Sequence, residues 1–220
     1  MKLSESTIEV LNNFSLINRS LVFKAGNVIK TISPTKTILA SAKVEDTIPS
    51  EFGIYDLSMF LGVVGLFDDP EFLILDKSMT ISQDKESVGY VFAAPSMIMT
   101  PPDKELKLPD PEIQFDLSND ILKRVLKVSN TLGTPEIAVS GDRESVYLEC
   151  LDVANKSNNT YKVKIAETDK QFKMVFLLEN IKMLPRDYKV EISSKGMAKF
   201  SAENIEYFVT TEAKSSSYDG

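Results

Sequence analysis

The sequence contains the same order of secondary structure twice, and this duplication most constrains what the chain can fold into. In each half, a strand runs directly into a short apolar segment of helical character, at residues 54–61 and again at 172–181. An amphipathic helix opens each half, at residues 4–17 and 118–132, because apolar side chains recur there at helical spacing. Prolines, which favour an extended and semi-rigid backbone, separate the halves at Pro101, Pro102, Pro109 and Pro111. The sequence therefore predicts an N-terminal domain (1–100), a linker (101–114), a C-terminal domain (115–213) and a polar tail (214–220).

Alternating apolar residues and turn residues predict the strands of both halves. In the first half we expect a hairpin of residues 21–23 and 28–30, strands at 37–44 and 52–55, a helix at 57–67 begun by Asp56, and strands at 72–75, 79–82 and 88–93. In the second half we expect strands at 136–140, 146–151, 161–165 and 172–176, a helix at 177–183, and strands at 188–193, 196–201 and 206–211. The predicted fold class is α+β, with two similar domains that each pack two helices on antiparallel sheet.

The composition argues against an enzyme. The sequence has no histidine, which removes the commonest general base and the commonest neutral metal ligand. Two acidic clusters, at residues 68–71 and 103–105, lie in segments predicted to be turn or linker, where carboxylates are usually solvated. We therefore expect a chain with no catalytic residues, no metal site and no cofactor.

The cysteine count and the apolar runs bear on location. The single cysteine, Cys150, excludes an internal disulfide, suits a reducing compartment, and falls on an alternating strand where we expect it to be buried. The longest apolar runs, such as residues 60–67, are too short to span a bilayer. The first residues lack the long apolar region of a signal peptide. We expect a cytoplasmic protein without a membrane partner.

One helix carries a candidate binding surface. Lys123, Arg124 and Lys127 project from the side of helix 118–132 opposite its apolar stripe, and polar Ser129 and Asn130 continue that side. An ordinary solvated helix face is the alternative reading. Three cations on one face of a chain with net charge −7 are nevertheless unusual. Such a face can meet the phosphates of a nucleic acid without reading its sequence.

Several short segments, in order and spacing across both halves, are similar to one known family. They are Met1-Lys2-Leu3-Ser4, Ile54-Tyr55-Asp56-Leu57 with Phe60-Leu61-Gly62, Leu126-Lys127-Val128-Ser129, Tyr188-Lys189-Val190 and Ala198-Lys199-Phe200. Through them nearly the whole chain resembles the sliding clamps of T-even-type bacteriophages, which are DNA polymerase processivity factors.

The resemblance implies a fold, an assembly and partners. It implies three subunits of two similar domains each, closed head-to-tail into a homotrimeric ring around duplex DNA, with sheets outside and helices lining the hole. It implies an ATP-dependent clamp loader, a tethered DNA polymerase and, in this group, contact with late-transcription factors. The residues expected to face DNA are Lys2, Lys123, Arg124, Lys127 and Lys182. The first helix departs from the family pattern because it carries Glu5 and Glu9 and no internal cation, so DNA contact should fall more heavily on the second domain.

A site for partner peptides is expected on the outer rim. An extended linker cannot bury its own apolar side chains, so Leu106, Leu108 and Pro109 must rest on a domain or face a ligand. We predict that they form one wall of a pocket, with the last strand supplying the other wall through Tyr207, Phe208 or Val209. The plain alternative is that these leucines only fix the linker to the second domain.

Two other functions remain open from the sequence. A structural protein of a virion or similar assembly would share the strand-rich halves and the acidity, but it would not need a basic helix face. A carboxylate- and metal-dependent nuclease is disfavoured because its acidic residues are scattered.

Overall fold

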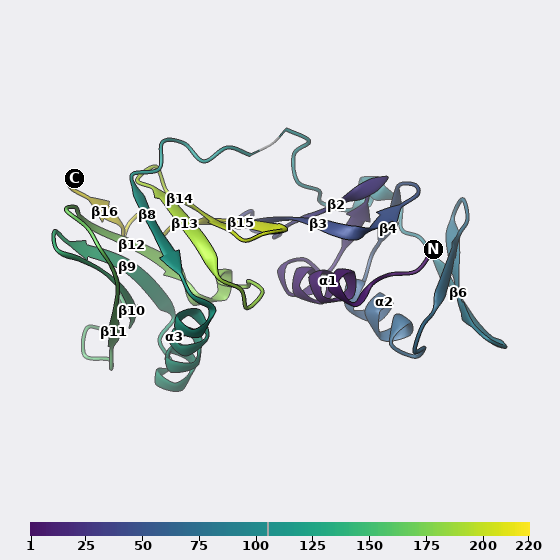
Figure 1. Cartoon of the computed structure of the whole chain (residues 1–220), viewed down its shortest axis with the longest axis horizontal. Helices are drawn as coiled ribbons and strands as arrows, with labels where there is room; N and C mark the ends of the chain where they lie inside the picture. Colours follow the sequence, from purple (N-terminus) through teal and green to yellow (C-terminus); the bar gives the residue numbers. More distant parts are fainter. Residues whose placement is uncertain (105) are drawn as a thin grey trace. The chain divides into compact units, whose positions relative to one another are not determined.

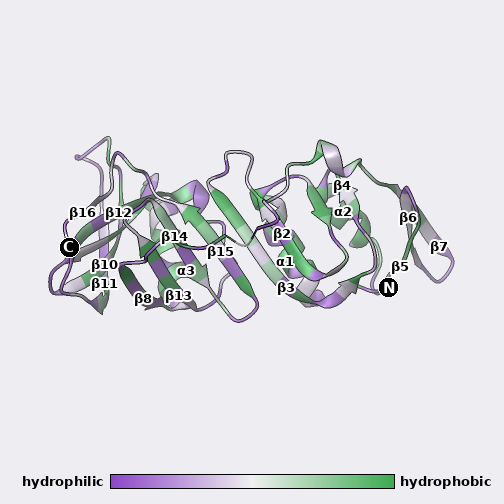
Figure 2. Cartoon of the chain, turned by 90° about the horizontal axis from the view of Figure 1, so that it is seen from above, coloured by the Kyte–Doolittle hydropathy of each residue, from purple (hydrophilic) through white to green (hydrophobic). Residues whose placement is uncertain are grey.

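The computed structural model describes residues 1–104 and 106–220, which divide into two compact units after Lys104. In the N-terminal unit, helix α1 (Glu5–Ile17) begins as predicted, because the Ser4 side chain accepts a hydrogen bond from the backbone N–H of Thr7. Leu11 and Phe14 on α1 are fully buried. Figure 2 shows hydrophobic residues along both α1 and α2 of this unit.

The first predicted hairpin is wrong. Strand β1 (Leu21–Phe23) pairs antiparallel with β4 (Phe52–Ile54), while β2 (Gly26–Ile32) pairs with β3 (Ile38–Ile48). Gly26 has a φ of 115°, a conformation that glycine adopts readily, and there the chain turns away from β1. All three residues of β1 are buried, and β1 forms a two-stranded sheet with β4.

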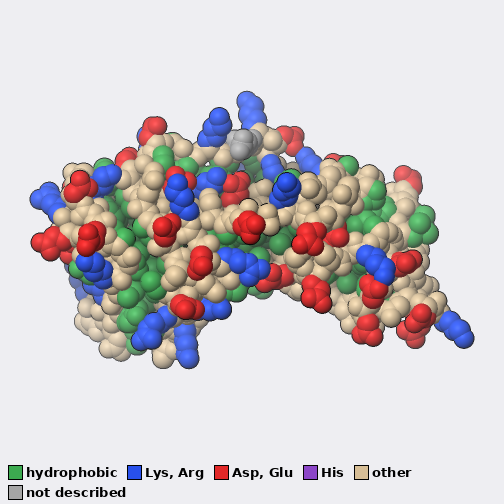
Figure 3. Space-filling model, in the orientation of Figure 1, with side chains coloured by type: hydrophobic (Ala, Val, Ile, Leu, Met, Phe, Trp, Pro, Cys, Tyr) green, Lys and Arg blue, Asp and Glu red, His purple; other side chains and the backbone are tan. Residues whose placement is uncertain are grey.

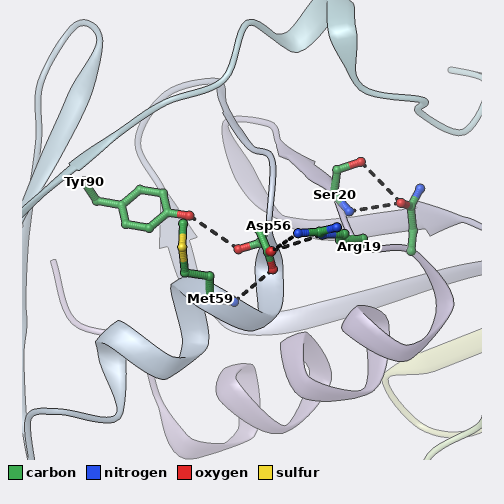
Figure 4. A network of polar contacts seen from close by, with 6 residues as sticks. Arg19, Ser20, Asp56, Met59 and Tyr90 are labelled. Carbon is green, nitrogen blue, oxygen red and sulfur yellow. Dashed lines mark hydrogen bonds and ion pairs between the residues drawn. The ribbon is translucent and has the colours of Figure 1, made fainter.

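Helix α2 (Leu57–Val64) is capped by Asp56, as the sequence predicted, although it ends three residues earlier than expected. Figure 4 shows the surrounding network: Asp56 accepts hydrogen bonds from the Met59 N–H at 3.0 Å and from two nitrogens of Arg19, and its backbone oxygen accepts one from the Tyr90 hydroxyl. The Met59 N–H, followed by the Arg19 guanidinium, lowers the pKa of the Asp56 carboxyl. The Leu57 N–H also donates to the Arg19 carbonyl, so the end of α1 is fixed to the start of α2.

A three-stranded meander completes the N-terminal unit, as predicted. It consists of β5 (Glu71–Ile74), β6 (Ser78–Gln83) and β7 (Glu86–Val91), with β6 in the centre. The outer edge of β5 is met by the start of the chain, where Met1 and Phe72 exchange two hydrogen bonds. A 3₁₀ turn, η1 (Pro95–Met97), follows.

The C-terminal unit opens with β8 (Ile113–Leu117) and α3 (Asn119–Leu132) (Figure 1). The Ser118 side chain caps the start of α3, and Gly133, in the left-handed conformation with a φ of 67°, ends it. Both ends lie within one residue of their predicted places, since the capping residues are explicit in the sequence. None of the described helices is long and apolar enough to cross a membrane.

A five-stranded antiparallel sheet packs beside α3, in the order β11-β10-β9-β12-β16. Its strands are β9 (Glu136–Asp142), β10 (Ser145–Leu151), β11 (Tyr161–Glu167), β12 (Gln171–Leu177) and β16 (Ser217–Tyr218). Within the polar tail, Ser217 and Tyr218 pair with β12 as β16. Cys150 on β10 is fully buried, as predicted, and its Sγ lies 3.5 Å from the Val125 carbonyl of α3.

The second sheet of this unit has the order β15-β14-β13-β8, with β13 (Tyr188–Ser193), β14 (Met197–Ser201) and β15 (Ile205–Thr210). The helix predicted at 177–183 is only a 3₁₀ turn, η2 (Leu178–Asn180). Two tyrosines hold the backbone beyond it: the Tyr188 hydroxyl donates to the Leu184 carbonyl at 2.7 Å, and the Leu184 N–H donates to the Tyr207 hydroxyl at 3.2 Å. These hydrogen bonds occupy the backbone N–H and carbonyl of Leu184, which a longer helix would use.

Candidate nucleic-acid interface and partner-binding groove

Helix α3 turns one face to the sheet and the opposite face to solvent. Its buried residues are Leu122, Val125 and Ser129. Ser129 was predicted to lie on the polar side of the helix, but it is buried. Its hydroxyl lies 2.6 Å from the Thr134 hydroxyl and donates to the Thr134 carbonyl at 3.0 Å. A satisfied serine can occupy a core position. Asn130 stays on the exposed side, as expected.

The cations of α3 are exposed together. Lys123, Arg124 and Lys127 are all exposed, and no carboxylate lies within ion-pair distance of them in the described part of the chain. Figure 3 shows a group of Lys and Arg side chains over the part of the C-terminal unit where Figure 1 draws α3. By contrast, several lysines of the same unit are paired with carboxylates: Lys162, Lys164, Lys189 and Lys195. The positive charge of α3 is therefore free to act on a ligand.

Arg124 is the one cation of this row with a fixed direction. Its Nε donates to the Tyr161 hydroxyl, at the start of β11, over 3.2 Å. The nitrogens at the end of the guanidinium remain available for an anion.

The other two cations expected to face DNA are less suited. Lys2 is exposed but forms an ion pair with Asp69, and this hydrogen bond raises the pKa of Lys2. Lys182 is half-buried beyond η2 and has an interaction within the chain. Contact of Lys2 and Lys182 with DNA stays a prediction.

Each of the two long helices has, at its N-terminus, an aspartate that is distant in the sequence. The Asp46 carboxylate on β3 accepts hydrogen bonds from the Ser4 N–H, the Ser4 hydroxyl and the Thr7 hydroxyl at the start of α1. Partial burial alone would raise the pKa of Asp46, but these hydrogen bonds outweigh it and lower that pKa below its ordinary value. At α3, the Asn119 N–H donates to Asp187 at 2.6 Å. These acids are structural: they orient the two helices and complement the positive end of each helix dipole.

The predicted wall of the partner pocket on the last strand is wrong. Tyr207 and Val209 are completely buried, and Phe208 is 3% exposed. Tyr207 packs edge-on against Tyr188, and its hydroxyl is held by the Leu184 N–H, so it belongs to the core. The linker residues Leu106, Leu108 and Pro109 are half-buried.

A groove that the sequence did not indicate lies wholly within the N-terminal unit. It has a volume of about 260 Å³, and its lining includes Val22, Val28, Lys30, Thr100 and the first linker residues, Pro101 to Asp103. Lys24 crosses one end in an ion pair with Asp103 at 2.5 Å. Val28 is 42% exposed although it lies within a strand. The groove is bordered by the first residues of the linker and not by Leu106, Leu108 or Pro109.

Within the described residues, no three acidic or cysteine side chains gather closely enough to hold a metal ion. Of the acidic segment at 68–71, Asp68 and Asp69 lie in a bend, in line with the turn that the sequence predicted, and Glu71 is the first residue of β5.

Comparison with protein families gives two matches that together cover most of the chain. Residues 2–90 match the family described as DNA polymerase processivity factor, and residues 114–213 match the C-terminal part of the gp45 sliding clamp. The sliding clamp of Vibrio phage KVP40 is 35% identical, over 97% of this chain and the whole of the relative. The sliding clamp of Enterobacteria phage T4 is 29% identical, over 98% of both chains.

Solved structures show the same fold at much lower identity. The PCNA of A. fulgidus, with the C-terminal region of FEN-1 bound, gives a TM-score of 0.71 at 12% identity, over 96% of this chain and 98% of that one. The Helicobacter pylori β clamp bound to a DNA ligase peptide gives 0.63 at 13% identity, over 97% of this chain and 67% of the other. The predicted fold class, α+β of the clamp type, is confirmed.

Proposed function

Because the chain belongs to the sliding-clamp family of DNA polymerase processivity factors, we propose that it closes into a ring around duplex DNA and holds the replicative polymerase at its template. The resemblance predicted from the sequence is thereby confirmed at the level of the family. The ring, its partners and its binding surfaces belong to the proposal, and features of the structure and the family resemblance support them.

The observation that carries the proposal is the unpaired cation row of α3. Lys123, Arg124 and Lys127 give an acidic protein one positive helix face. Contacts from such a face to phosphates supply binding that is independent of base sequence and weakens as salt rises. A clamp that must slide needs this kind of contact, because a base-specific contact would stop it. A structural protein of a virion would have no use for such a face.

The ring is proposed to contain three subunits joined by strand edges. β7 has six residues and β11 has seven, and each pairs with only one strand among the described residues. The outer edge of β5 is partly occupied by Met1, which leaves β7 as the open edge of the meander. Open edges in natural proteins are normally paired or protected, and joining unlike edges head-to-tail closes a ring when the rotation permits. Sedimentation or native mass spectrometry at micromolar concentration should give the trimer mass, and a monomer alone would refute this assembly.

The groove beside the linker is proposed as the site where the polymerase and other partners insert a short apolar peptide. Val22, Val28 and Pro101 supply apolar surface, and one or two large side chains can fill about 260 Å³. Val28→Asp should weaken polymerase binding at least tenfold while leaving the ring intact, because Val28 is already 42% exposed. Leu66→Asp is the matched control, since Leu66 is 71% exposed and does not line the groove. Equal binding by the two variants would place the peptide elsewhere.

The remaining parts of the proposal follow from the family resemblance. The protein acts in the host cytoplasm, is placed on DNA by an ATP-dependent loader, and also receives late-transcription factors. It carries out no catalysis and needs no metal or cofactor. The direct test is DNA synthesis on a primed circular template: the protein should lengthen the products of the phage polymerase only when the loader and ATP are present. Products of unchanged length would reject the function.

A further inference from the structure

We propose that Tyr161 is a positioning residue for DNA: its hydroxyl holds the Arg124 guanidinium extended on the face of α3, ready for a phosphate. The inference rests on the proposed function and adds to it a residue outside the basic helix. It explains why one arginine stands between two lysines in the cation row.

The position of Tyr161 is set by the protein core. Tyr161 is the register partner of Cys150 on the neighbouring strand. Cys150 is fully buried, and its Sγ lies 3.5 Å from the carbonyl of Val125, the residue after Arg124. The start of β11 is thus fixed beside the middle of α3 by contacts that do not involve the tyrosine hydroxyl. The fold therefore places the Tyr161 hydroxyl beside the Arg124 side chain.

The hydrogen bond uses the part of Arg124 that a phosphate needs least. The Nε–H donates to the Tyr161 hydroxyl at 3.2 Å, while the two terminal nitrogens keep the paired N–H groups that match phosphate oxygens. A free arginine side chain must be ordered when it binds, at a cost that weakens affinity. Tyr161 removes part of that cost in advance. Among the described residues, none gives Lys123 or Lys127 such support, and a lysine presents a point charge that depends less on direction.

Tyr161→Phe tests this inference because it deletes only the hydroxyl. The probe is a short linear duplex carrying a fluorophore, titrated with the clamp at low salt and followed by anisotropy. We expect Tyr161→Phe to weaken binding about two- to tenfold, which corresponds to the cost of ordering one long side chain. In an Arg124→Ala background, the same change should have no further effect. Thermal unfolding of Tyr161→Phe should match that of the unchanged protein. Tyr147→Phe, on the adjacent strand β10, is the matched control and should leave DNA binding unchanged.

The outcomes separate this inference from the proposed function. If the unchanged clamp fails to lengthen polymerase products on a primed circle with the loader and ATP present, the proposed function fails. If it passes that test but does not bind the duplex at low salt, the proposed phosphate contact of Arg124 is absent and the positioning role is refuted. If it binds and Tyr161→Phe binds equally well, the positioning role is refuted while the function stands. An equal loss in the Arg124→Ala background would also refute it, because the hydroxyl would then act without the arginine.

Discussion

Neutralising the cations of α3 should remove most of the salt dependence of DNA binding. The triple variant Lys123→Gln, Arg124→Gln, Lys127→Gln keeps residues that favour helix and removes three exposed charges that have no carboxylate partner within the described residues. Because all three side chains are exposed, the free energy of unfolding should change by about 0.5 kcal/mol or less for each substitution.

The magnitude follows from the number of phosphate contacts. Each contact contributes about −0.9 to the slope of log affinity against log salt concentration. Raising salt from about 50 to about 200 mM therefore weakens binding about 3.5-fold per contact. If the α3 helix of one subunit touches DNA at a time, its three phosphate contacts together weaken binding about 40-fold over this salt range. The affinity of the unchanged protein should fall by this additional factor across the range, and the slope of the triple variant should be smaller by about 3.

The assay is anisotropy on a short duplex at several salt concentrations, with helix content and thermal unfolding measured in parallel. The control variant neutralises three exposed lysines away from α3, namely Lys36, Lys77 and Lys214. It has the same net charge as the triple variant, so a loss through overall charge would appear in both. Equal slopes for the two variants would refute the assignment of DNA contact to α3.

The structure supports three further predictions. Gly141→Ala should destabilise the C-terminal unit by about 1–3 kcal/mol in urea unfolding, because an added Cβ would lie 2.7 Å from a backbone carbonyl; Gly62→Ala, which meets nothing within 4 Å, should be neutral or slightly stabilising. Asp46 has a lowered pKa in the folded chain, so its contribution to the free energy of unfolding is present at neutral pH and is lost as pH falls through that pKa. Asp46→Asn should therefore flatten the decline of stability below about pH 4. An unchanged decline would refute the stabilising role of the Asp46 carboxylate. Val91→Asp, at a site 76% exposed on the open edge, should convert trimer into folded monomer in sedimentation, and an intact trimer would exclude that edge.

Local signals in the sequence predicted most helix boundaries. Ser4, Asp56 and Ser118 each cap the helix that follows, and Gly133 ends α3. These residues act within one helical turn, so their effect can be read without knowledge of distant partners. The exposed cations of α3 were predictable for the same reason, because the helix was correctly placed and its faces follow from its period.

Long-range pairing and burial were not predictable from local patterns. β1 pairs with β4, about 30 residues further along the chain, and nothing near Leu21–Phe23 indicates this partner. Ser129 was expected in solvent because serine is polar, but Thr134 satisfies it inside the core. Tyr207 was expected to line a pocket, whereas it packs edge-on against Tyr188 and its hydroxyl accepts a hydrogen bond from the Leu184 N–H. Each of these differences arises where a partner distant in sequence or a hydrogen bond decides the outcome.

Retention on closed and on linear DNA tests the central claim most directly. The protein is loaded onto a nicked circular duplex, separated from free protein by gel filtration at moderate salt, and the plasmid is then cut once with a restriction enzyme. The account predicts that the clamp stays on the circle and leaves after the cut, because a ring around DNA slides off a free end while its phosphate contacts remain weak. Equal retention on circular and cut DNA would contradict encirclement and would mean that the protein binds DNA by surface contact alone.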